Sequence, residues 1–430
     1  MVAFLMLGIF VVLLVLRVPV EIAVGLGALA GVLWVGAPLD VVSRTMVGSV
    51  DNFILLAVPF FILSGNLMNV TGVTDRIFDF ARAATGHLRG GLAQVNVFGS
   101  MVFAGMSGAA VADLAALGVI EIKAMREHGY SVRMAAAVSL ASCTVGPIIP
   151  PSIVLVVYGL MTEVSIGRLF LGGIIPGILI GVFLMIAVYI YSYWRPYEFG
   201  PTERFSWREL FRTAWRAKLE LLTPIVIVGL LLTGTATPTE VGVFATLYSL
   251  FLGIMNRQLT LRHLYACVAS TLGTTAIIMY LIAVSTVLGD IIVQERIAHH
   301  LTEYVGGMTK NPLLALMAIN GFLLIVGMLI DSLPALIIAS SVLMPVIKSL
   351  GIDQVHFGII ICFNLIIGII TPPMGIGLYV ASRVANIPVE EVLKAVVPFC
   401  IPLLLSLLVI TAVPELSTWL PNLVFGLAAK

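Results

Sequence analysis

The sequence predicts an all-α polytopic membrane protein built from inverted-topology repeats, and three observations lead to that prediction. Of its 430 residues, 60% are hydrophobic and only 10% are charged, whereas soluble domains carry about 25% charged residues. The apolar runs are long and continuous, unlike the short alternating segments of a transmembrane β-barrel. A proline pair, Pro150-Pro151, recurs as Pro372-Pro373 inside a second apolar run, 222 positions later (372 minus 150).

Composition and short motifs exclude several classes of protein. The formal net charge is +1, so nothing indicates nucleic-acid binding. The four cysteines lie in apolar runs without metal-ligand spacing, so we expect free thiols. The sequence has no HExxH or Gly-x-Ser-x-Gly motif, so we do not expect an enzyme. The first residues are apolar without a basic segment before them, which predicts a first membrane helix rather than a cleaved signal.

Long apolar runs predict about ten membrane crossings, since each needs roughly 20 apolar residues. They lie near residues 2–16, 18–36, 53–70, 134–162, 169–194, 219–236, 238–254, 265–289, 356–382 and 395–413. Two further apolar stretches, 92–122 and 313–347, carry small or polar residues at their centres. A central turn favours two half-length helices over one very long helix. We therefore expect two re-entrant hairpins that enter and leave the membrane on the same side.

The two halves of the chain repeat each other. Residues 19–24 match residues 238–243 at an offset of 219, and the proline pairs match at 222. Chance alignment of common glycines and prolines is the alternative, but order, spacing and element type all agree. Five crossings then separate equivalent points, and an odd number inverts the second half. The expected units are a first repeat at 1–194, a connector at 195–218 and a second repeat at 219–430. Each repeat contains one broken helix, at 134–162 in the first and at 356–382 in the second.

The distribution of positive charge predicts the orientation of these units. With the N-terminus outside, 17 of the 23 lysines and arginines lie on the cytoplasmic side, as the positive-inside rule requires. The six on the outer side are Arg44, Arg168, Arg296, Lys310, Lys348 and Lys430. Both termini are then periplasmic. The first hairpin should open from the cytoplasm and the second from the outside.

The connector at 195–218 carries tryptophans and arginines at helical spacing. This pattern favours an amphipathic helix lying on the cytoplasmic membrane surface. An ordinary basic linker that obeys the orientation rule is the alternative, and neither version carries a catalytic site.

The two helix breaks are the first candidate sites. Proline removes a backbone donor and clashes with the preceding turn, so each helix must open at its proline pair. Carbonyl groups freed where a half-helix ends suit a hard cation such as sodium, and N–H groups where one begins favour an anion. A simple proline kink is the alternative reading, but two matched kinks, each beside a hairpin, argue against it.

The hairpin tips supply further oxygen atoms beside the breaks. The expected cation ligands are Ser107, Gly146, Pro147, Pro150, Asp331, Ser332, Gly368, Thr371 and Pro372. The expected substrate-binding residues are Ser107, Gly108, Ser152, Met374 and Gly375. Asp113 is a second acid in an apolar stretch, and a role as a helix-start carboxylate is as well supported as a functional one.

No lysine or arginine lies near the middle of these segments. An anionic substrate would therefore be held by helix N-termini, hydroxyl groups and bound cations. Anion affinity would then depend on cation binding, which is a physical basis for symport.

Several of these motifs resemble those of a known family. They are DNFILLAVPFFILSG at 51–65, SGAAVAD at 107–113, PPS at 150–152 with Tyr158-Gly159, and TPPMG at 371–375. Together they resemble the large membrane subunit, of the DctM or SiaM type, of tripartite ATP-independent periplasmic (TRAP) transporters. The resemblance covers essentially the whole chain.

The resemblance implies a fold, a function and partners. It implies sodium-coupled import of organic acids such as dicarboxylates or sialic acid across the bacterial inner membrane, with Na⁺ as the coupling ion and an elevator motion. It also implies a small four-helix membrane subunit, which would be a separate chain here, and a periplasmic substrate-binding protein. The alternatives are a stand-alone sodium/dicarboxylate symporter of related fold and, further away, a membrane scaffold or an intramembrane enzyme.

Overall fold

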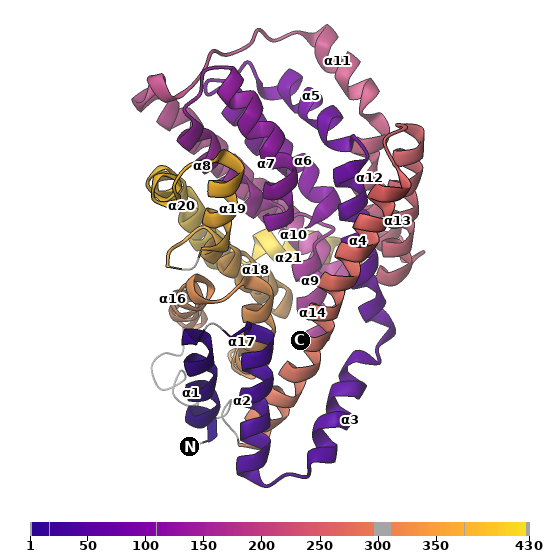
Figure 1. Ribbon diagram of the computed structural model, residues 1–430, viewed down its shortest axis with the longest axis vertical. Coiled ribbons are helices and arrows are strands. Elements are labelled where there is room, and N and C mark those ends of the chain that lie inside the picture. Colours follow the sequence, from indigo (N-terminus) through magenta and orange to yellow (C-terminus); the bar gives the residue numbers. More distant parts are fainter. Residues whose placement is uncertain (1, 17, 109, 296–310, 374, 427–430) are drawn as a thin grey trace.

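The computed structural model describes residues 2–16, 18–108, 110–295, 311–373 and 375–426. All regular elements within these residues are helical, and they form one elongated bundle (Figure 1). The helices α5 and α11 lie at one end of the long axis, and α1, α2 and α3 lie at the other. The fold class predicted from the sequence, an all-α polytopic membrane protein, is confirmed.

The first half of the chain and the start of the connector supply thirteen elements. They are α1 (Val2–Val15), α2 (Val20–Val35), α3 (Leu39–Val50), η1 (Phe53–Leu56), α4 (Ala57–Val70), α5 (Val73–Thr85), α6 (Leu92–Ser107), α7 (Ala110–Glu127), α8 (Val132–Ser142), η2 (Cys143–Val145), α9 (Ile153–Thr162), α10 (Ile166–Trp194) and η3 (Pro196–Glu198).

The connector and the second half supply the remaining elements. They are α11 (Trp207–Arg216), α12 (Lys218–Leu232), α13 (Pro238–Met255), α14 (Leu261–Gln294), α16 (Pro312–Leu329), α17 (Ser332–Ser349), α18 (Gln354–Ile369), α19 (Ile376–Ala385), α20 (Val389–Ala412) and α21 (Glu415–Phe425).

The hairpins and broken helices of the two halves pack against one another. Within each half, α6 packs on α8 and α16 packs on α18. Between the halves, α7 packs on α19 and α17 packs on α9. Every residue of α18 from Val355 to Ile369 is buried, so this helix is the centre of the packed core. The interlocking of the halves makes these eight helices one packed unit.

A second group of helices lies along one flank of the bundle. α13 packs on α4, and α14 packs on both α2 and α4. α14 has 34 residues and is therefore about 51 Å long at 1.5 Å per residue. It exceeds the roughly 30 Å hydrocarbon core of a bilayer and crosses obliquely to its neighbours (Figure 1).

Seven helices of the described chain are long and apolar enough to cross a membrane. Both arms of the second hairpin, α16 and α17, are among them by length and composition, so the re-entrant arrangement of 313–347 stays a prediction. Three helices were not predicted: α3, α5 and α21. Each is shorter than a crossing, and α5 carries Asp75, Arg76 and Arg82 among its apolar residues.

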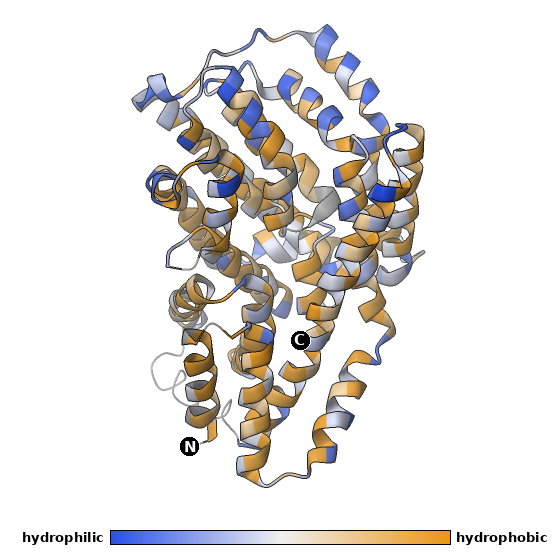
Figure 2. Ribbon diagram, in the orientation of Figure 1, coloured by the Kyte–Doolittle hydropathy of each residue, from blue (hydrophilic) through white to orange (hydrophobic). Residues whose placement is uncertain are grey.

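Polar residues gather at the end of the bundle that carries α5 and α11 (Figure 2). In α11, the aromatic side chains Trp207, Phe211 and Trp215 are all exposed. Arg208 and Arg212 each follow one of them in the sequence, so a basic stripe runs beside the aromatic stripe. This arrangement suits a helix that lies in the membrane interface.

The predicted orientation can be tested by cysteine labelling at the hairpin bases. Position 126 at the end of α7 and position 348 at the end of α17 are both exposed. In a variant without the native cysteines, we expect Arg126→Cys to react with an impermeant maleimide from the cytoplasmic side only. Lys348→Cys should react from the periplasmic side only. Labelling of both positions from one side would contradict the inverted topology.

Candidate functional site

The first helix break is a buried loop between two helical segments. η2 ends at Val145, and α9 begins at Ile153 with Ser152 as its N-cap. The Ser152 hydroxyl accepts a hydrogen bond from the Leu155 N–H at 3.1 Å and donates one to the Pro147 carbonyl oxygen. Ser152 therefore joins the end of one half-helix to the beginning of the next.

The tip of the first hairpin presses directly on this break. Gly108 ends α6 in the left-handed region with φ 64°, a conformation that favours glycine. A Cβ atom at Gly108 would lie 2.5 Å from the Pro151 carbonyl oxygen and 3.0 Å from the Ser152 Cα. Ser107 is the last residue of α6. The structure thus brings predicted tip and break residues into contact.

Asp113 lies in the first turn of α7, next to the same break. Its Oδ2 atom is 2.8 Å from the position that a Cβ would take at Gly146. Asp113 is also buried. This carboxyl group therefore faces the end of the first half-helix, while its place in the first turn also suits the N-terminal dipole of α7.

The second break has a similar outline but a different environment. α18 ends at Ile369, and α19 begins at Ile376 after Gly375, which has φ 35°. Thr371 donates its hydroxyl to the Ile367 carbonyl oxygen at 2.8 Å. Pro372 is exposed, whereas Pro150 of the first break is buried. In both breaks the two prolines are joined by a cis peptide bond. Met374 lies outside the described residues.

The second hairpin contacts α18 through glycine. A Cβ atom at Gly368 would lie 2.3 Å from both the carbonyl carbon and the carbonyl oxygen of Gly327 in α16. At the tip of this hairpin, Asp331 is the N-cap of α17, and its Oδ1 accepts a hydrogen bond from the Ser332 N–H at 2.8 Å. Asp331 therefore has a structural role in the helix start, and its predicted role in cation binding stays a prediction.

A buried asparagine on each hairpin joins that hairpin to its broken helix, and sequence reasoning missed both asparagines. In the first half, the Ser142 hydroxyl donates to Asn96 Oδ1 at 2.6 Å. In the second half, Asn364 Nδ2 donates to Asn320 Oδ1 at 2.9 Å. Their offsets, 224 for the asparagines and 222 for their partners, follow the internal repeat. The sequence does contain a signal for them, because each apolar stretch holds an asparagine and the two are separated by nearly the repeat length.

The contact in the second half leaves one side-chain oxygen without a hydrogen bond among the described residues. Asn320 donates onward to the Thr411 hydroxyl at 2.9 Å. Asn364 Oδ1 is buried and has no hydrogen-bond partner within the described part of the chain. A buried amide oxygen without a donor costs free energy, and it is a suitable ligand for a hard cation. Asn364 sits seven residues before Thr371, in the half-helix that leads to the second break.

The donor set around the breaks consists of carbonyl, hydroxyl and amide oxygens. Such oxygens suit a hard cation, whereas thiolate and imidazole select softer metals. Among the residues that the structure describes, no group of three or more His, Cys, Asp or Glu side chains is placed to hold a metal ion.

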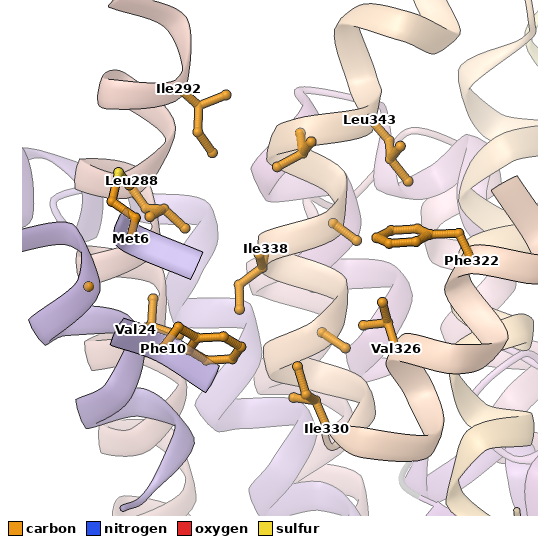
Figure 3. Close-up of a pocket in the computed structure, with 14 residues that line it drawn as sticks. Met6, Phe10, Val24, Leu288, Ile292, Phe322, Val326, Ile330, Ile338 and Leu343 are labelled. Atoms are coloured by element: carbon orange, nitrogen blue, oxygen red, sulfur yellow. The ribbon is translucent and has the colours of Figure 1, made fainter. Parts of the chain in front are cut away.

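A separate apolar cavity has no residue of either break in its lining (Figure 3). Its volume is about 280 Å³, and its walls come from α1, α2, α14 and the second hairpin. Phe10, Ile338 and Phe322 project into it. Because its lining side chains are all apolar, this cavity cannot satisfy the charge of an organic anion.

Comparison with known proteins identifies the family. Residues 7–416 match the model of the DctM component of the tripartite ATP-independent periplasmic transporters. The chain belongs to this family. It is therefore a multi-pass transport protein rather than an enzyme.

Three relatives show how widely the family match extends. The chain is 42% identical to the sialic acid TRAP transporter large permease protein SiaM of Vibrio cholerae, over 90% of this chain and 91% of that protein. It is 36% identical to the C4-dicarboxylate TRAP transporter large permease protein DctM of the same species, over 96% of each chain. It is 38% identical to the isethionate TRAP transporter permease protein DctMQ of Oleidesulfovibrio alaskensis, over 95% of this chain and 65% of that protein.

A solved structure shares the fold of this DctM-family chain. The YdaH transporter of Alcanivorax borkumensis, described as having an unusual topology, superposes with a TM-score of 0.62 at 16% identity. The match covers 89% of this chain and 88% of that one. At this level of identity, the likeness shows the fold alone.

Proposed function

We propose that this protein is the large permease subunit of a sodium-coupled importer of organic acid anions. The observation that carries the proposal is the pair of hairpin and broken-helix units, each with a buried amide that joins hairpin to helix. One unit has Gly108 pressed on the Pro151 carbonyl group, and the other has Gly368 pressed on Gly327. Broken helices at matching points of two repeats are the usual location of a transport site.

We place one sodium ion at each break. In the first unit, the ligands proposed are Ser107, Gly146, Pro147 and Pro150, next to the buried Asp113. In the second unit, they are Asp331, Ser332, Gly368, Thr371 and Pro372. Asn364 lies about two helical turns before Thr371, and we propose its Oδ1, which has no donor among the described residues, as a ligand for a sodium ion at the hairpin contact rather than at Thr371. A sodium ion bound to this buried oxygen would take the place of the missing hydrogen-bond donor.

The substrate anion would lie between the two units. The N-terminus of α9 begins there with Ser152 as its cap, and helix N-termini attract anions through their free N–H groups. Ser107, Gly108, Met374 and Gly375 complete the proposed substrate site. The proteins that this chain resembles are named for a sialic acid, C4-dicarboxylates and a sulfonate. A carboxylate or related organic anion is the substrate class that they share.

The packing supports an elevator motion. The hairpins and broken helices of both halves interlock through α7 with α19 and α17 with α9. The α4, α13 and α14 group lies along one flank and meets the first group where α4 packs on α6 and α9 and where α14 packs on α17. We propose that the first group carries substrate and cations across the membrane while the second group stays fixed.

The family implies two partners and a location. The partners are a small four-helix membrane subunit and a periplasmic substrate-binding protein. We propose that the complex resides in the bacterial inner membrane, with both termini of this chain in the periplasm.

A reconstitution experiment tests the function. The permease with its membrane partner is placed in liposomes, the binding protein is added outside, and uptake of a panel of organic acids is measured under an inward sodium gradient. We expect uptake that falls to background when the gradient is dissipated. Uptake that persists with a proton gradient alone would contradict sodium coupling, and uptake without the binding protein would favour a stand-alone symporter.

A further inference from the structure

Glu121 is a buried carboxyl group that the proposed transport site does not use. It lies on α7, the second arm of the first hairpin, and its side chain is only 2% exposed. It precedes the end of α7 at Glu127 by six residues, which is about 9 Å along the helix. α6 and α8 both pack against α7. The carboxyl group is thus enclosed inside the packed unit that contains the first break.

The polar neighbours of Glu121 are Ser139 of α8 and Asn96 of α6. Asn96 Nδ2 already donates to the Ser139 hydroxyl oxygen at 2.6 Å, and Asn96 Oδ1 already accepts from Ser142. The Ser139 O–H and the second N–H of Asn96 are therefore the donors that Glu121 can use. Glu121 Oε1 has no hydrogen-bond partner within the described residues.

The ion pairs of the described chain do not include Glu121. The charged side chain that acts on it is Asp113, a like charge eight residues earlier on the same helix. A carboxylate in this setting would have two neutral donors, Ser139 and Asn96, no cation beside it and a neighbouring negative charge. Burying such a charge costs several kcal/mol, so the group takes up a proton instead.

The same network connects Glu121 to the first break. From Ser139 and Asn96 it continues to Ser142, which accepts from the Ser100 hydroxyl at 3.0 Å and directly precedes η2. Asp113, at the other end, faces Gly146 of the break. Glu121 is therefore connected to the first break in two ways: by a chain of buried hydrogen bonds through Ser139, Asn96 and Ser142, and through Asp113, which acts on both.

We propose that Glu121 is a proton-binding site whose occupancy opposes cation binding at the first break. A cation at the break adds positive potential beside Asp113 and disfavours a proton on Glu121. By linkage, a proton on Glu121 weakens cation binding by the same factor. The direction follows: sodium should bind more weakly as pH falls through the range in which Glu121 is protonated.

Other titratable groups on the packed elements do not account for this effect. η2 contributes the Cys143 thiol, which is buried, and α6 contributes only amides and hydroxyls near Glu121. Arg133 of α8 pairs with Glu198 at 3.1 Å. α19 carries Tyr379 and Arg383, and α7 also carries Lys123, Arg126 and Glu127; all five are exposed.

The experiment compares Glu121→Gln with the wild type, and it rests on the proposed sodium-coupled function. Glutamine has the shape of the protonated acid but cannot release a proton. Sodium titrations of uptake are run at pH 6 and pH 8 in the reconstituted complex. We expect the half-saturating sodium concentration of the wild type to rise about fivefold to tenfold at the lower pH, and that of Glu121→Gln to change less than about twofold. Glu127→Gln, an exposed acid on the same helix, is the matched control and should behave as the wild type.

Two further measurements keep the test decisive. Infrared spectra of the purified complex should show a carboxylic acid C=O band that Glu121→Gln lacks and Glu127→Gln retains. If the glutamine variant does not fold, Ser139→Ala removes one of the two donors to Glu121 and should move the pH midpoint of the sodium effect upward. An equal pH dependence in wild type and Glu121→Gln would overturn the linkage. Absence of any sodium effect in the wild type would overturn the proposed function, while the infrared band would still report whether Glu121 holds a proton.

Discussion

Replacing Gly368 with alanine should nearly abolish uptake and lower the stability of the purified protein. The added methyl group would meet the Gly327 carbonyl carbon and oxygen at 2.3 Å. Those are backbone atoms of α16, so they cannot rotate away as a flexible side chain would. α16 and α18 must separate, and the asparagine contact between them must lengthen. We expect a loss of about 2 kcal/mol in the free energy of unfolding, as overpacked cores show.

The measurement is thermal unfolding in detergent together with uptake in liposomes. Gly321→Ala is the matched control, because Gly321 lies on α16 with no atom within 4 Å of its Cβ position. That control should be neutral or more stable by up to about 1 kcal/mol through helix propensity. Gly327→Ala should have an intermediate effect, since its nearest contact, the Leu365 carbonyl oxygen, lies at 3.2 Å. Equal stability of Gly368→Ala and Gly321→Ala would contradict the close helix contact.

The sequence predicts the fold class well because hydropathy and proline act locally. Long apolar runs mark membrane helices, and the proline pairs fix where two of them open. The helices α3, α5 and α21 escape such reasoning because each is shorter than a crossing. Their positions depend on tertiary packing, as when α5 packs on α6.

The candidate site was only partly predictable for a similar reason. Ser152 and Gly108 could be identified because a helix start and a tight turn have local signatures. The asparagine contacts could not, because the partners Asn96 and Ser142 are 46 positions apart. Only the packing of a hairpin on its broken helix brings them together. The same packing buries Pro150 but leaves Pro372 exposed, a difference that two similar sequence motifs do not reveal.

The second large effect is expected at Asn364, whose side-chain amide joins the second hairpin to the broken helix α18. Replacing it with leucine removes the donor to Asn320 Oδ1 and the free Oδ1 that we assign to sodium. A lost ligand of this kind is worth about 1–3 kcal/mol. Since 1.4 kcal/mol corresponds to a tenfold change, the half-saturating sodium concentration should rise about tenfold or more.

A matched variant separates cation binding from loss of the network. Thr411→Val removes the other partner of Asn320, at 2.9 Å, but leaves Asn364 and the second break intact. Asn364→Leu loses the two bonds from Asn364 Nδ2 to the carbonyl oxygen and the Oδ1 of Asn320. Thr411→Val also loses two, one from Asn320 Nδ2 and one to the Leu407 carbonyl oxygen, so the stabilities should fall by similar amounts. Sodium titration of uptake should distinguish them, with less than about a twofold change for Thr411→Val. If Asn364→Leu and Thr411→Val shift the sodium titration equally, Asn364 holds the hairpin in place and does not bind the cation.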